Sequence, residues 1–158
     1  MGSDVLEVGP GPGASTTILR ARVPRLICIE TNRAYANTLQ RRYNGSVRVV
    51  CEDAAAMSLG DRSFDAVVCF SMLHHVPSAD LRDRLLAQAG RVLRSGGIFA
   101  GTDSLYSHSF RLLHLFDTMV IVDPETFPAR LQAAGFCDVQ VDVMQPHAFR
   151  FRARKPAD

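Results

Sequence analysis

The sequence has 158 residues, 47% of them hydrophobic, and its 18 basic and 16 acidic residues leave a formal net charge of +2. This length predicts a single domain over residues 1–158 with a sizeable core, and the near balance of charges gives no argument for a nucleic-acid partner. No apolar run approaches the length of a membrane span and no signal peptide is visible, which favours a cytoplasmic location.

The first element is a short apolar run that ends in three alternating glycines. Residues 5–8 predict a buried parallel strand, and Gly9, Gly11 and Gly13 follow it directly. Residues 14–20 can form the start of a helix, so the glycines lie on a strand-to-helix turn. Glycine allows positive φ and close approach of a ligand, and a helix N-terminus offers free N–H groups. Such a turn is therefore typical of a nucleotide site.

Strands and helices then alternate, which predicts a mainly parallel sheet with helices on both faces. A helix after the second strand has Thr31 or Asn32 as its cap and Tyr35, Leu39 and Tyr43 on one face. A second helix begins after a Ser78 cap and ends at residues 95–97, with its apolar face formed by Leu81, Leu85, Ala89, Val92 and Leu93. Further strands are expected at residues 25–29, 47–51, 64–70 and 98–102.

The last third of the chain predicts a segment that covers the sheet and an antiparallel pair of strands at the edge of the sheet. Residues 104–122 are apolar and aromatic, and we expect a helix or helical loop over the top edge of the sheet. Asp123 and a following proline open another helix, with Leu131 and Ala134 buried. Polar and apolar residues alternate at 137–143 and 148–154, which is typical of an antiparallel edge pair.

Each of the four cysteines lies in an apolar run that predicts a strand, and none forms a C-x-x-C pair. We expect buried thiols in a reducing compartment, rather than disulfides or a zinc site. These residues are Cys28, Cys51, Cys69 and Cys137.

Acidic residues follow three of the predicted strands, namely Glu30, Asp53 and Asp103. Carboxyl ends of parallel strands meet at one edge of such a sheet, where ligands bind. A carboxylate after the second strand suits a ribose diol, and one after the third can accept from the exocyclic amine of adenine. The spacing of Gly9, Gly11 and Ala14 also fits the looser dinucleotide pattern, so the glycines alone do not decide which nucleotide binds.

Several motifs in order resemble the class I S-adenosylmethionine-dependent methyltransferases over nearly the whole chain. They include the glycine stretch, Glu30, the Asp53-Ala54 pair, and the fourth-strand run from residue 64 to 76, which ends in Leu73-His74-His75-Val76. Residues 93–97 resemble the turn before that family's fifth strand, and residues 133–136 resemble the entry to its closing hairpin. The small-molecule branch, which includes the quinone-biosynthesis methylases, is the most similar.

The resemblance implies a Rossmann-like α/β three-layer sandwich with a mostly parallel seven-stranded sheet. Its strand order would be 3-2-1-4-5-7-6, with an antiparallel C-terminal hairpin and without the family's N-terminal helices. It also implies S-adenosyl-L-methionine as cofactor, S-adenosyl-L-homocysteine as product, and a small, partly apolar methyl acceptor. Because so little precedes the first strand, we expect a truncated form or an open cleft, with a second copy of the chain as a candidate to complete that side.

The resemblance further assigns cofactor-binding roles. Gly9, Gly11 and Gly13 would pass under the methionine part, Glu7 would support their loop, and Glu30 would hold the ribose hydroxyls. Thr31 would pack near the adenine, whose amine and ring nitrogen would meet Asp53 and the Ala54 N–H. The backbone at Phe70 and Ser71 would face the methionine ammonium.

A general base is needed only for a weakly acidic acceptor, and His75 is the first candidate, with Asp103 as another. His74 is expected to point away, and His108 and His114 to form part of the pocket wall. A metal held by His74, His75 and Asp103 is not favoured, because adjacent histidines rarely share one face.

Two other functions fit the same residues. One is an NAD-dependent oxidoreductase, in which Glu30 would bind the nicotinamide cofactor's ribose, although nothing indicates a hydride-transfer constellation. The other is a cofactor-binding domain without catalysis, since folds of this type have many functions.

Overall fold

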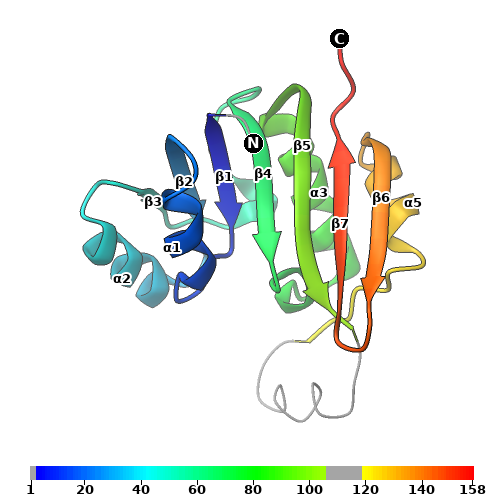
Figure 1. Ribbon diagram of the computed structural model, residues 1–158, viewed down its shortest axis with the longest axis horizontal. Coiled ribbons are helices and arrows are strands. Elements are labelled where there is room, and N and C mark those ends of the chain that lie inside the picture. Colours follow the sequence, from blue (N-terminus) through cyan, green and yellow to red (C-terminus); the bar gives the residue numbers. More distant parts are fainter. Residues whose placement is uncertain (1–2, 106–118) are drawn as a thin grey trace.

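Seven strands form one mixed sheet in the order β3-β2-β1-β4-β5-β7-β6. The computed structural model describes residues 3–105 and 119–158. The first five strands are parallel, and β7 runs antiparallel to both of its neighbours, β5 and β6 (Figure 1). This order and the antiparallel edge confirm the predicted fold class. The strands are β1 (Asp4–Val8), β2 (Arg25–Ile29), β3 (Arg48–Val50), β4 (Phe64–Phe70), β5 (Leu93–Ser104), β6 (Cys137–Met144) and β7 (Ala148–Arg154).

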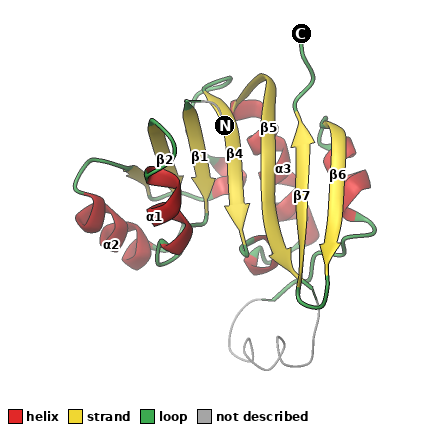
Figure 2. Cartoon of the chain, viewed as in Figure 1, coloured by secondary structure: helices red, strands yellow, loops and turns green. Residues whose placement is uncertain are grey.

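Helices cover the sheet in two layers (Figure 2). On one face, α1 and α2 pack on the first four strands through a cluster that includes Val5, Leu26 and Leu39. On the other face, α3 and α5 cover a larger cluster that includes Leu6 and Phe99. The helices are α1 (Ala14–Arg20), α2 (Arg33–Tyr43), α3 (Ala79–Val92) and α5 (Phe127–Ala133), with 3₁₀ turns η1 (Ala54–Ala56) and η2 (Leu73–His75).

Side-chain caps fix where two of these helices begin. The Asn32 side chain accepts hydrogen bonds from the N–H groups of Ala34 and Tyr35, which satisfies two of the free donors at the start of α2. The Ser78 hydroxyl accepts from the N–H of Leu81 at the start of α3. The Ser78 cap was predicted from the sequence, and Asn32 is one of the two predicted caps, Thr31 being the other. The Asn32 cap places the first turn of α2 at the carboxyl edge of the sheet.

The structure corrects several predicted boundaries. Strand β3 ends at Val50, so Cys51 lies beyond it, and β5 begins at Leu93, within the run that predicted a helix stop. Helix α5 begins at Phe127 because Asp123 instead caps a turn, its carboxylate accepting from the Glu125 N–H.

Some predicted buried positions are also wrong. Tyr35 is 44% exposed, because the buried face of α2 is formed by Ala36, Leu39 and Tyr43. Leu81 and Ala134 are only half-buried. Among the cysteines, Cys28 and Cys69 are buried, Cys137 is half-buried and Cys51 is exposed, and all four are free thiols.

The expected cover over the top edge of the sheet falls mostly on residues 106–118, outside the described residues, as do His108 and His114. Within the described residues, no helix is long and apolar enough to cross a membrane.

Candidate functional site

A cavity of about 680 Å³ opens where the carboxyl ends of β1, β2 and β4 meet. It is the place where the strand-end residues were expected to converge. Three residues of the predicted site lie outside its lining, namely Glu7, Gly13 and Asp103. The predicted residues that line it are Gly9, Gly11, Glu30, Thr31, Asp53, Ala54, Phe70, Ser71 and His75.

Gly11 and Gly13 of the turn are needed for two different reasons. Gly11 has φ +54, and a Cβ built on it would meet nothing within 4 Å, so its bare backbone faces the open cavity. Gly13 has φ +87, and a Cβ there would lie 2.4 Å from Leu39 Cδ2. The second glycine therefore serves the packing of α1 against α2, whereas the first leaves room for a ligand.

The Glu30 carboxylate is held by two backbone donors. Its Oε2 accepts from the Gly11 N–H at 2.9 Å, and its Oε1 accepts from the Asn32 N–H at 2.8 Å. The side chain is only 5% exposed and lies on the cavity wall. An ionised carboxylate has about four lone-pair sites, so two acceptor positions remain for hydroxyl donors from a ligand.

Glu7 lies beneath the turn. Its carboxylate accepts from the hydroxyls of Ser15 and Thr16 and from the Cys28 thiol, and it is 1% exposed. Burial, and next the charge of Glu7, raise the pKa of the Cys28 thiol far above its usual range. The arrangement ties β1 to the first turn of α1, so Glu7 acts on the cavity through the backbone.

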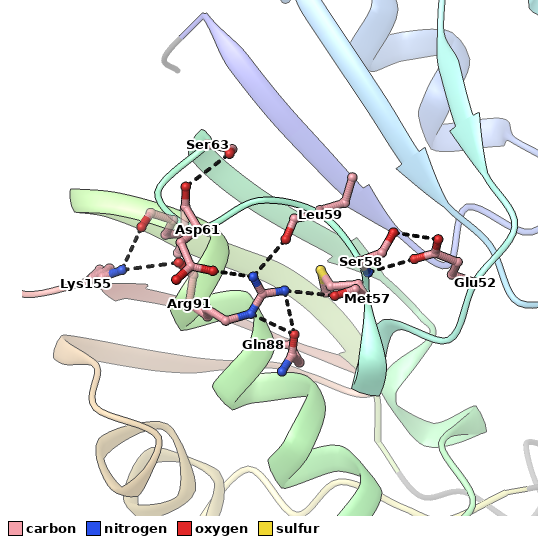
Figure 3. A network of polar contacts seen from close by, with 10 residues as sticks. Glu52, Met57, Ser58, Leu59, Asp61, Ser63, Gln88, Arg91 and Lys155 are labelled. Atoms are coloured by element: carbon pink, nitrogen blue, oxygen red, sulfur yellow. Dashed lines mark hydrogen bonds and ion pairs between the residues drawn. The ribbon is translucent and has the colours of Figure 1, made fainter.

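The Asp53 side chain is exposed and lies at the cavity rim, where its Oδ1 accepts from the Ala55 N–H at 2.8 Å. The loop that follows is anchored on both sides (Figure 3). Arg91 donates to the carbonyls of Met57 and Leu59, and Glu52 accepts from the backbone N–H and hydroxyl of Ser58. Asp53 thus presents its second carboxylate oxygen from a fixed turn.

The end of β4 brings the backbone of Phe70 and Ser71 to the cavity. Ser71 has φ +50, and its N–H donates to the Thr102 carbonyl at 2.8 Å. A positive φ at a non-glycine residue is uncommon and is frequent at functional sites. The next residue, Met72, packs on Gly9, because a Cβ at Gly9 would lie 2.9 Å from Met72 Cε.

The two adjacent histidines have different surroundings. His74 is buried, and its Nδ1 lies 2.5 Å from Oδ1 of the fully buried Asp103. Asp103 also accepts from the N–H groups of His74 and Ser104. His75 is exposed and lines the cavity, with its ring centroid 4.1 Å from that of His74. Asp103 therefore contacts His74 and not the cavity, and among the histidines of residues 3–105 and 119–158 it is His75 that lines the cavity.

Arg82, on α3, binds the turn η2 that carries the two histidines. Its guanidinium is 4% exposed and donates to the carbonyls of Leu73 and Val120. Burial lowers the pKa of this guanidinium. Within the described part of the chain, no group of three or more metal-ligating residues lies close enough to hold an ion.

Sequence reasoning missed several residues of the cavity wall, among them Asn32, Tyr35, Glu52 and Met72. Each is a neighbour of a predicted residue or lies one turn along from it. The only available signal was this adjacency, since the pattern of α2 assigned Tyr35 to the core.

Comparison with known proteins assigns the family. Residues 6–101 match the methyltransferase domain family, which is more than half of the chain. The chain is 34% identical over 106 residues to a fatty-acid O-methyltransferase of Mycolicibacterium smegmatis, which covers 65% of this chain and 38% of that protein. It is also 34% identical over 58 residues to ribosomal RNA small subunit methyltransferase A of Fusobacterium nucleatum, covering 35% and 22%.

The fold agrees. Phosphoethanolamine N-methyltransferase 2 of Haemonchus contortus, solved with phosphomonomethylethanolamine and S-adenosylhomocysteine, superimposes with a TM-score of 0.83 at 17% identity. The superposition covers 99% of this chain and 49% of that one.

These findings define a class I S-adenosylmethionine-dependent methyltransferase fold, and the chain belongs to the methyltransferase domain family. It spans less than two fifths of the length of either curated relative described above.

Proposed function

We propose that this chain is an S-adenosylmethionine-dependent methyltransferase that binds its cofactor in the cavity at the carboxyl edge of the sheet. The observation that carries the proposal is the convergence of Gly11, Glu30 and Asp53 on that cavity. When bound, the cofactor would supply a sulfonium methyl group to an acceptor that attacks the methyl carbon in line, with S-adenosylhomocysteine as the leaving group.

The residues present fit this cofactor. Gly11 leaves its side-chain direction open, so a ligand can approach the backbone. Glu30 keeps two acceptor positions for the ribose hydroxyls, and Asp53 offers an acceptor to the adenine amine next to the Ala54 N–H. Two backbone donors hold Glu30 before a ligand arrives, which lowers the entropy lost on binding.

The chain's contribution to catalysis is to align the acceptor with the methyl group. Holding two reactants in a near-attack geometry supplies up to roughly 7–11 kcal/mol. His75, beside the end of β4, is positioned to accept a proton from a hydroxyl or ammonium acceptor. Asp103 and His74 fix the turn on which His75 lies, so they are positioning residues.

The acceptor we propose is small and partly apolar. Met72, Val76, Leu81 and Leu85 contribute an apolar part of the cavity lining. We place the protein in the cytoplasm, because all four cysteines are free thiols. A second copy of the chain remains our candidate partner, and light scattering of the purified protein tests it.

Calorimetry with S-adenosylhomocysteine tests the binding step. Asp53→Ala removes one carboxylate acceptor, and we expect affinity to fall about tenfold or more, as for a hydrogen bond to a charged group of about 1.5–3 kcal/mol. Asp123→Ala is the matched control, because Asp123 caps an exposed turn through the same contact two residues on, at 3.0 Å against 2.8 Å. Equal affinities of the two variants would contradict the assigned role of Asp53.

Two further measurements separate the alternative functions. Binding of NADH without binding of S-adenosylhomocysteine would favour the oxidoreductase. Binding of S-adenosylhomocysteine with no methyl transfer to a panel of fatty acids, phenols and amines would favour a non-catalytic domain. We expect transfer to at least one acceptor class, with His75→Gln lowering turnover and leaving cofactor affinity unchanged.

A further inference from the structure

The net charge of +2 conceals a strong segregation of charge along the chain. Residues 1–50 hold seven arginines and three acidic residues, a net charge of +4, whereas residues 51–158 hold eleven basic and thirteen acidic residues, a net charge of −2. Of the three acids, Glu7 and Glu30 are buried, and Asp4 is bonded to Arg25 and Arg94. The surface of this first part therefore presents guanidinium groups with almost no carboxylate to neutralise them.

Five of these arginines form what we call the arginine patch. All five are exposed, and in the described part of the chain none of them forms an ion pair with a carboxylate. They lie on α1, in the turn after it, and on α2. The arginine patch consists of Arg20, Arg22, Arg33, Arg41 and Arg42.

Direct contacts join the two helices into one surface. The Arg20 guanidinium lies 5.6 Å from the centre of the Tyr43 ring, and the Tyr43 hydroxyl lies 2.9 Å from Oγ1 of Thr17. Arg42 donates to the Pro12 carbonyl at 2.8 Å. Figure 1 shows α1 and α2 side by side on the same face of the sheet. Arg33 begins α2 directly after Asn32, so the patch extends to the rim of the cavity.

We propose that the arginine patch binds the phosphate backbone of a nucleic-acid strand. The planar guanidinium fork matches phosphate oxygens in a bidentate geometry, and several such contacts give sequence-independent binding. Among the arginines the exposed positions are mostly polar, such as Thr17, Asn37 and Gln40, with Ile18 and Tyr35 as the large apolar exceptions.

A nucleic acid fits this surface better than a folded acidic protein does. Protein interfaces have an apolar, aromatic-rich centre that excludes water, whereas Ile18 and Tyr35 are the two large apolar side chains that α1 and α2 expose. Phosphate recognition needs only positive charge and donors, which the patch supplies. The site lies outside the cavity, so this inference goes beyond methyl transfer and holds whether the acceptor is a small molecule or part of the bound strand.

Fluorescence anisotropy of the full 158-residue chain with a labelled oligouridylate of roughly 20 nucleotides tests the proposal. If five phosphates are contacted, the slope of log K against log salt is about −3.5, and affinity falls about 100-fold between about 50 and about 200 mM salt. The double variant Arg33→Gln/Arg41→Gln removes two contacts. Its slope becomes about −2.1, and the loss over the same range becomes about 20-fold.

The matched control is Arg84→Gln/Arg152→Gln, which removes the same charge from exposed arginines on α3 and β7. We expect its slope to equal that of the unmodified chain. Equal effects of the two double variants would overturn the proposal, because net charge alone would then explain binding. Failure to bind the oligouridylate, with patch-dependent binding of a labelled polyglutamate, would overturn it in favour of an acidic protein partner.

Discussion

Substitution of Gly11 by alanine separates the conformational role of the glycine turn from its role toward a ligand. Gly11 has φ +54 and open space where a Cβ would lie. The left-handed conformation costs an L-residue about 1–2 kcal/mol. Loss of glycine's freedom in the unfolded chain offsets about 0.4–1 kcal/mol of this. The net expectation is a free energy of unfolding lowered by about 1 kcal/mol.

Gly45 supplies a matched control. It has φ +84, and a Cβ there also meets nothing within 4 Å, but it lies in the turn after α2, away from the cavity lining. Gly45→Ala should therefore cost about the same stability. The added methyl group at Gly11 occupies the space that the ligand needs. We expect Gly11→Ala alone to weaken S-adenosylhomocysteine binding at least about tenfold, or about 1.4 kcal/mol.

Urea denaturation and calorimetry measure the two quantities separately. If Gly11→Ala and Gly45→Ala bind S-adenosylhomocysteine equally well, the ligand does not pass over Gly11 and the assigned orientation is wrong. If Gly11→Ala has a much lower free energy of unfolding than Gly45→Ala, the added methyl group at Gly11 clashes with the protein, and the space there is not open.

Two further predictions concern the ion-paired carboxylate of Asp65 and the buried guanidinium of Arg82. The Asp4 N–H and the Arg94 guanidinium lower the pKa of Asp65 to about 2 from 3.8, so its stabilising contribution is present above pH 3.8 and is lost as pH falls toward 2. Because the carboxylate is partly exposed, we expect its protonation to lower the free energy of unfolding by about 1 kcal/mol between pH 3.8 and pH 2. Asp65→Asn should lack this acid-dependent loss, which urea denaturation at the two pH values measures. Arg82→Met leaves the carbonyls of Leu73 and Val120 without their buried donor, and we expect about 2–4 kcal/mol of destabilisation; a loss under about 1 kcal/mol would mean that water replaces the guanidinium.

The predicted bounds of the elements were most accurate where the run of mostly apolar residues had no glycine. Strand β4 has the predicted bounds, Phe64–Phe70, because every residue of the run except Asp65 pairs with β1 or β5. Strand β5 was predicted too short because Gly96 and Gly97 suggested an end to structure. In the sheet they form an irregularity, where Phe64 pairs with Leu93 and Ala66 pairs with Ile98. A bulge of this kind depends on the partner strand, which local sequence does not reveal.

Strand parity accounts for the two carboxylates that lie outside the cavity lining. Successive side chains of a strand point to opposite faces, and Glu7 shares its face with Val5, whose cluster lies under α1 and α2. Asp103 likewise shares its face with Phe99, on the α3 side, where it contacts His74. Parity alone would have directed Glu7 toward α1. That its partners are the hydroxyls of Ser15 and Thr16 follows only from the packed helix.

Two carboxylates hold the glycine turn from opposite sides. Glu7 fixes the start of α1 from below, and Glu30 binds the Gly11 N–H from the cavity side. A turn with positive φ at Gly9, Gly11 and Gly13 has many alternative conformations when unconstrained, so its shape depends on these bonds. The carboxylate proposed to bind the ribose therefore also orders the backbone that approaches the methionine part. One group coupled to two adjoining parts of the ligand, the ribose and the methionine part, gives a site that is formed before the ligand arrives, which favours affinity by lowering the cost of ordering.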